Sequence, residues 1–117
     1  MSRHRTDIAL SQMRDHAKEA LDLAKGKQRE DLDAQRVLNL ALVRLLEIVG
    51  EAANRMPPED RDRYPQIPWP QIIGLRHRLI HAYDQVDFDI LWEIVTRDLP
   101  PLVAELERIV SAIDAGD

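Results

Sequence analysis

LNLALVRLLEIVGEAANRM, residues 38–56, is the stretch of sequence that decides the fold. Its apolar side chains recur at intervals of three and four residues, which is the spacing of one face of an α-helix. They are Leu38, Leu42, Leu45, Val49, Ala52 and Met56, with Leu40, Val43 and Ile48 beside them. This width predicts a helix over about residues 32–56 that is central and buried on more than one side.

The same stretch carries a polar stripe. Its members are Arg44, Glu47, Glu51 and Arg55. Glu51 and Arg55 are four residues apart, in the order that favours an ion pair along a helix. The stripe therefore predicts a ladder of salt bridges on this helix.

A helix is also predicted over about residues 7–25, before the central one. Thr6 is a suitable N-cap, and Gly26 is a suitable stop after the last turn. Alanines dominate the repeating face of this segment, so it allows another helix to approach closely.

The central helix ends at Pro57, where a proline-rich loop begins. This loop, PPEDRDRYPQIPWP at residues 57–70, predicts a short helical turn followed by extended chain. Ile67 and Trp69 are its expected anchors to the core. A third helix is predicted from Pro70 to about Tyr83.

The last helix is predicted to begin near Asp87, which is a possible N-cap. Pro100 and Pro101 predict a kink or break within it, because proline removes a backbone donor. The fold class is therefore all-α: one domain over residues 1–117, built as a bundle of four main helices plus the short turn.

Composition excludes several classes of site. The 117 residues include no cysteine and four glycines, so neither a cysteine-bound metal nor a glycine-rich phosphate loop is present. No apolar run approaches the roughly 20 residues of a membrane span. The first ten residues, MSRHRTDIAL, lack an apolar signal core, which favours a cytoplasmic protein with no membrane contact.

Charge is distributed unevenly along the chain. The net charge is −5, yet residues 63–83 contain no acidic side chain and carry three arginines. Residues 84–117 contain nine acidic and two basic side chains. The positive segment is either ordinary scatter or a local site for a polyanion.

The segment LRHRLIHAYD, residues 75–84, places an arginine where apolar side chains are expected. On an ideal helix Arg76 and Tyr83 fall in the middle of the apolar arc. An arginine there needs a carboxylate, a phosphate or a polar cleft, unless its long side chain reaches past the core to solvent. Glu51 and Asp84 are the expected carboxylate partners.

His81 is the natural proton-transfer residue of this segment, although a surface histidine is the simpler interpretation. Arg76 and His81 point in different directions on an ideal helix, so a second copy of the helix across a two-fold axis would be needed to unite them. His77 and His81 have a spacing that suits a shared metal, with Asp84 as the nearest third ligand. We predict no metal site, because no further ligand stands out.

Residues 75–100, LRHRLIHAYDQVDFDILWEIVTRDLP, resemble the HepT-like toxin family of the HEPN superfamily. The motif of that family is Arg, four to six residues, His, one residue and Tyr, which Arg76, His81 and Tyr83 match. The segments LLEIVGEAANRM and RYPQIPWPQIIGLR also resemble the family, so that the likeness covers about residues 5–112.

The resemblance implies a metal-independent endoribonuclease toxin, dimeric through facing motif helices. Arg76 and His81 would be catalytic. His77 stands where the family commonly has asparagine and would support them. Tyr83 matches the tyrosine that a cognate minimal nucleotidyltransferase antitoxin adenylylates.

The resulting hypothesis is a homodimer, or a higher assembly, that cleaves RNA, with tRNA among the possible substrates and no DNA expected. It needs no cofactor, since ATP is used only by the partner nucleotidyltransferase. One alternative is a non-catalytic subunit that binds a nucleotide or substrate for a nucleotidyltransferase. The other is a structural dimerisation module with a decayed site.

Overall fold

The computed structural model describes residues 3–80 and 85–116, and these are helical apart from short connections and one isolated antiparallel bridge between Ile80 and Val86. The elements are α1 (Arg3–Ala24), α2 (Asp31–Ala34), α3 (Arg36–Arg55), α4 (Pro58–Arg61), α5 (Trp69–Ile73), α6 (Leu75–Leu79), α7 (Phe88–Glu93), the π-helical segment η2 (Ile94–Asp98) and α8 (Leu99–Asp114). The all-α prediction is confirmed, with α4 as the helical turn in the proline-rich loop.

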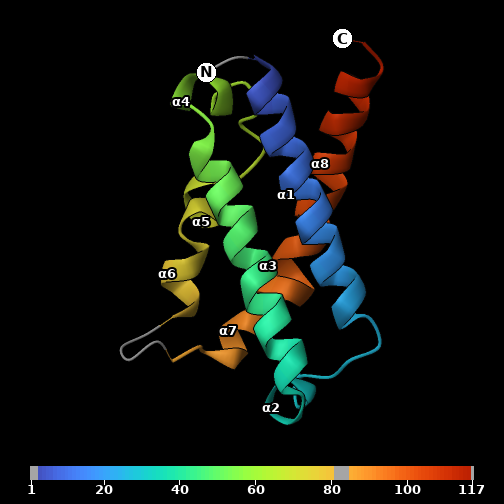
Figure 1. Cartoon of the computed structure of the whole chain (residues 1–117), viewed down its shortest axis with the longest axis vertical. Coiled ribbons are helices and arrows are strands. Elements are labelled where there is room, and N and C mark those ends of the chain that lie inside the picture. Colours follow the sequence, from blue (N-terminus) through green and yellow to red (C-terminus); the bar gives the residue numbers. More distant parts are fainter. Residues whose placement is uncertain (1–2, 81–84, 117) are drawn as a thin grey trace.

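The long helices form a layered bundle with α1 between α3 and α8 (Figure 1). Helices α5 and α6 lie on the opposite side of α3 from α1. Large aliphatic side chains from every layer are fully buried between them, among them Leu10, Leu42, Leu46, Leu79, Leu91 and Leu106. Each such side chain contributes about 1.5–3 kcal/mol on burial, so the shared core holds α3 centrally, as predicted.

Helix α1 begins earlier than predicted, and Thr6 lies inside it rather than at its N-cap. The Thr6 hydroxyl donates a hydrogen bond of 2.5 Å to the Asp60 carboxylate on α4, and both residues are buried. Thr6 therefore satisfies a buried acid instead of a helix end. Gly26 does follow the helix, with a φ of +78° that favours glycine.

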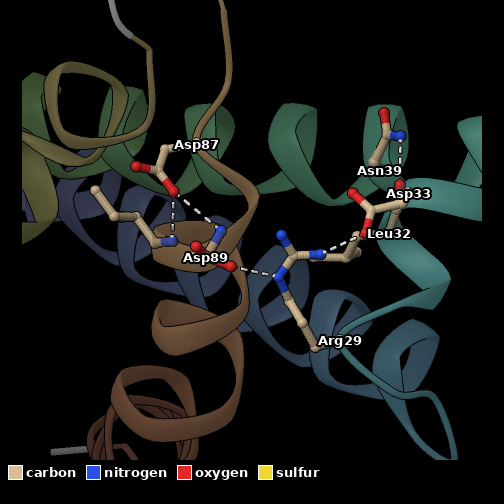
Figure 2. Close-up of polar contacts among 7 residues, drawn as sticks. Arg29, Leu32, Asp33, Asn39, Asp87 and Asp89 are labelled. Atoms are coloured by element: carbon tan, nitrogen blue, oxygen red, sulfur yellow. Dashed lines mark hydrogen bonds and ion pairs between the residues drawn. The ribbon is translucent and has the colours of Figure 1, made fainter.

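The predicted helix over residues 32–56 is wrong at its start, because the chain is extended at Gln35 between α2 and α3. The buried Asn39 side-chain amide donates to the Leu32 carbonyl at 2.8 Å (Figure 2). It replaces the backbone donor that a continuous helix would supply. Beyond the break, Val37 and Leu40 are exposed, so Leu40 does not widen the buried stripe.

The proline-rich loop is anchored as predicted, since Ile67 and Trp69 are both buried. The Trp69 indole N–H donates to the carbonyls of Arg61 and Tyr64, each at 3.0 Å. This pair of bonds joins the start of α5 to the end of α4.

The predicted helix from Pro70 to Tyr83 is wrong in two places. Gly74 interrupts it, with a ψ of 7°, and it ends at Leu79. Ile80 is extended and pairs with Val86. The extended conformation and the bridge at Ile80 have therefore replaced helix at that residue, and the rest of the expected helix, residues 81–83, lies outside the described residues.

The final helix begins as predicted. Asp87 caps α7 by accepting hydrogen bonds from the backbone N–H groups of Asp89 and Ile90. The predicted break also occurs, as η2, directly before Pro100 and Pro101. These prolines cannot donate to the preceding turn, and the wider π-helical turn accommodates the loss.

Among the residues that the structure describes, no helix combines the length and the apolar character needed to cross a bilayer.

Gly50 on α3 marks a close approach between α3 and α5. A Cβ at this position would lie 2.9 Å from the Ile72 carbonyl oxygen of α5, nearer than side chains normally come. The contact is with backbone, which cannot move aside without displacing α5. Only glycine therefore allows α5 to pack at this depth.

We predict that Gly50→Ala destabilises the fold by about 1–3 kcal/mol, because the added methyl group overpacks the contact with α5. Helix propensity alone would give the opposite sign, a gain of about 1 kcal/mol. Urea unfolding measures the change in free energy. The exposed Ala104→Gly on α8 serves as the control for propensity, and a stabilised Gly50→Ala protein would contradict the close approach.

Candidate functional site

Arg76 on α6 forms an ion pair with Glu47 on α3. Its Nη1 lies 2.6 Å from Glu47 Oε2. The Arg76 side chain is 63% exposed, whereas that of Glu47 is only 16% exposed. A nearly buried carboxylate thus holds an exposed guanidinium at the protein surface.

The expected position of Arg76 in an apolar arc is wrong. The buried residues of this segment are Ile72, Leu75 and Leu79, whereas Ile73 and Ile80 on the other side of the expected arc are only partly buried. Arg76 therefore lies at the edge of the buried face rather than in its middle. A carboxylate does meet the guanidinium, but it belongs to Glu47 rather than Glu51.

The polar stripe of α3 has different pairs from those predicted. Glu51 accepts from Arg44 Nη1 at 3.1 Å, and the same nitrogen lies 3.8 Å from Glu47. Arg55 instead donates to the Gln12 side chain of α1. The predicted Glu51–Arg55 pair is therefore wrong, because Arg55 reaches across the interface between α1 and α3.

A hollow of about 150 Å³ lies beside the ion pair. Its lining consists of Glu47, Gly50, Glu51, Asn54, Ile73 and Arg76. Carboxylate, amide and guanidinium groups thus meet at one surface depression, on an otherwise apolar junction of α3 with α5.

His81, Tyr83 and Asp84 lie outside the described residues, so their predicted roles are not located by the structure. The described residues that precede and follow them are hydrogen-bonded to each other through the backbone. The Asp87 backbone N–H donates to the Leu79 carbonyl at 2.9 Å, and Ile80 pairs with Val86. Leu79 and Ile80, which precede residues 81–84, are therefore held next to Val86 and Asp87, which follow them.

Arg29 pairs with acidic side chains on two elements, α2 and α7. Figure 2 shows its guanidinium between Asp33 and Asp89, with the capping Asp87 bonded to the backbone of Asp89. The contacts are 2.7 Å from Nε to Asp89 and 3.0 Å from Nη1 to Asp33. The hydrogen bond to Asp89, with the further contact to Asp33, raises the pKa of Arg29. The start of α7 is thereby connected to α2 as well as to Leu79.

His77 follows Arg76 on α6 and is exposed. Within the described residues, no three histidine, cysteine, aspartate or glutamate side chains gather as a metal would require. The predicted pair of His77 with His81 lies partly beyond those residues.

The positive charge of residues 63–83 is compensated by other elements. Arg78, the second arginine of α6, lies 3.3 Å from Asp98 on η2, while Arg76 pairs with Glu47 of α3. The charge imbalance of the sequence is therefore largely balanced in space, although Arg76 remains exposed.

Glu47 is the site residue that the sequence analysis missed. Periodicity places Glu47 only in the polar stripe and leaves Glu51 and Asp84 as the expected partners of Arg76. A signal was available in Gly50, which lies one turn after Glu47 and marks the side of α3 that another backbone approaches.

Comparison with known proteins gives one consistent answer. The family model described as Ribonuclease HepT-like matches residues 13–109. A provisionally assigned RNase of Methanocaldococcus jannaschii is 33% identical over 97 residues, covering 83% of this chain and 80% of that protein. One from Caldanaerobacter subterraneus is 38% identical over 90 residues, covering 77% and 80% respectively.

A third relative is the probable ribonuclease HepT of Thermococcus cleftensis. It is 36% identical over 95 residues, which cover 78% of this chain and 86% of that protein. No solved structure matches the chain significantly.

We predict that Arg76→Ala changes the free energy of unfolding by less than about 1 kcal/mol, because exposed ion pairs add little stability. Leu79→Ala, three residues away and fully buried, should cost about 2–5 kcal/mol. Urea unfolding of both variants provides the comparison. A large loss for Arg76→Ala would mean that the arginine serves the fold rather than a ligand.

Proposed function

We propose that this chain, which belongs to the ribonuclease HepT-like family, is a metal-independent endoribonuclease that uses Arg76 and His81. The relatives matched over most of their length are named as ribonucleases. Their names support RNA as the substrate class here.

One observation carries the proposal. Arg76 is mostly exposed, yet its guanidinium is held at 2.6 Å by the carboxylate of Glu47, whose side chain is only 16% exposed. A surface ion pair of this kind contributes little to stability. It does orient a guanidinium, whose planar donors suit the oxygens of a phosphate.

The proposed reaction is attack of a ribose 2′-hydroxyl on the adjacent phosphate. A new bond joins the 2′ oxygen to phosphorus while the bond from phosphorus to the 5′ oxygen breaks. His81 accepts the 2′-hydroxyl proton or, as imidazolium, donates a proton to the leaving 5′ oxygen. Arg76 stabilises the additional negative charge on the phosphate oxygens in the transition state.

A two-fold homodimer would complete the site. The hollow beside Arg76 measures about 150 Å³ in one chain, less than the 300–1,000 Å³ typical of small-molecule pockets. A second copy with its own Arg76 and His81 would enlarge it into a cleft for an RNA strand. His77, exposed next to Arg76, would then line the same cleft.

Tyr83 is the proposed control point. Adenylylation by a minimal nucleotidyltransferase antitoxin would attach a phosphodiester two residues after His81. Its negative charge would compete with the RNA phosphate for Arg76. In this proposal ATP is consumed only by the antitoxin.

We predict that Arg76→Ala and His81→Ala each lose RNA cleavage and toxicity without unfolding. Loss of the acid–base group should lower the rate by about 10²–10⁴. The measurement is cleavage of total RNA by purified, unmodified protein in the presence of EDTA. His4→Ala, which removes an exposed histidine from α1, is the matched control, and His77→Asn should have a mild effect.

Three outcomes would contradict this assignment. Full cleavage by a folded His81→Ala protein would remove His81 from the reaction. Activity lost in EDTA and restored by zinc or manganese would make the histidine pair metal ligands. RNA or nucleotide binding without any cleavage would favour the accessory subunit of a nucleotidyltransferase.

We predict that Tyr83→Phe keeps much of the toxicity but escapes silencing by the antitoxin, because the ring remains while the acceptor hydroxyl is lost. Intact mass after co-expression with a cognate nucleotidyltransferase, measured beside growth, tests this. Tyr64→Phe alters the other tyrosine of the chain and should still gain AMP. A mass gain that persists in Tyr83→Phe would place the modification elsewhere.

A further inference from the structure

We infer that Arg44 on α3 is a second phosphate-binding residue, and that it acts with Arg76 on neighbouring phosphates of one RNA strand. This inference rests on the proposed ribonuclease function and adds a binding residue that the motif does not contain.

Glu47 lies between two guanidinium groups that come from different elements. Its Oε2 is 2.6 Å from Nη1 of Arg76, and its Oε1 is 3.8 Å from Nη1 of Arg44. Two cations so close together repel each other in the absence of a shared anion. The Glu47 carboxylate therefore makes their proximity possible.

Burial separates the roles of the three residues. The side chains of Arg44 and Arg76 are 60% and 63% exposed, against 16% for Glu47. The acid is thus the internal part of the cluster, and both guanidinium groups are accessible to a ligand. Such pairs stabilise a fold only weakly, so this arrangement favours a role in binding.

Each guanidinium retains donors for a ligand. Within the described part of the chain, Arg44 and Arg76 make their ion pairs through Nη1 alone. A guanidinium has five N–H donors in one plane, and its other edge can bind a phosphate in bidentate fashion. Glu51, which also contacts Arg44, limits the rotation of that side chain.

The cluster offers two separate guanidinium groups but no net charge, which favours a polyanion over a single free anion. Arg44 and Arg76 are balanced by Glu47 and Glu51, so the four side chains have no net charge. A single free phosphate would gain little from such a cluster. A strand gains from two short, directed contacts at once, because the second contact forms within one molecule.

The test measures binding of a single-stranded RNA whose 2′-O-methyl groups prevent cleavage. Affinity is recorded against salt concentration for wild type, Arg44→Gln and Arg97→Gln. Arg97 lies on η2, is 76% exposed and is paired with Glu93, so its replacement removes the same charge without touching the Glu47 carboxylate.

Arg44→Gln should weaken binding about tenfold at moderate salt. It should also lower the slope of log affinity against log salt by about 0.7 for each phosphate that the variant no longer neutralises. Arg97→Gln should match wild type in both measures. Arg44→Lys should keep most of the salt dependence, because it retains the charge, and lose part of the affinity with the planar donor group.

Cleavable RNA provides the second readout. Arg44→Gln should raise KM with a much smaller effect on kcat than Arg76→Ala has. If Arg44→Gln behaves like Arg97→Gln while wild type binds and cleaves RNA, only this inference is wrong. A fall in kcat with an unchanged salt slope would also overturn it, since Arg44 would then act through Glu47. If wild type neither binds nor cleaves RNA, the proposed function fails as well.

Discussion

At Gly50 the backbone of α5 lies so close to α3 that a methyl group would approach the Ile72 carbonyl to 2.9 Å. This contact sets the depth at which α5 packs, and α6 follows after a single residue. The start of α6 is thereby placed level with the preceding turn of α3, where Arg76 meets Glu47. At the other end of α5, the Trp69 indole is bonded to two carbonyls of the proline-rich loop. The position of the motif arginine thus follows from backbone packing more than from attraction between charges.

Backbone and side-chain contacts also join the described residues that flank positions 81–84. Leu79 is fully buried, and its carbonyl accepts from Asp87, whose side chain in turn caps α7. Arg29 then connects α7 to α2 through Asp89 and Asp33. Caps and exposed ion pairs are individually worth about 1 kcal/mol or less. Together they hold Leu79 and Ile80 next to Val86 and the start of α7, and connect α7 to α2.

Much of the fold is encoded locally. The apolar repeats predicted the long helices, Asp87 predicted the start of the last one, and Pro100 and Pro101 predicted its break. The errors fall where a tertiary contact overrode periodicity. Asn39 replaced a backbone donor at Leu32 and allowed α2 to separate from α3. The apolar arc expected for residues 72–83 was too wide, because Ile73 and Ile80 are only partly buried and α6 ends at Leu79.

For the candidate site too, some features follow from the sequence alone and others only from the tertiary structure. By itself the sequence determined the family resemblance, since the order and spacing of Arg76, His81 and Tyr83 are local properties of the chain, and the match to the HepT-like family confirms that resemblance. The tertiary structure alone decided which acid Arg76 meets. Glu47 and Glu51 are equivalent by periodicity, four residues apart on one stripe. Only the packing of α5 against Gly50 brings α6 to the level of Glu47, because a contact between distant segments depends on how their backbones meet.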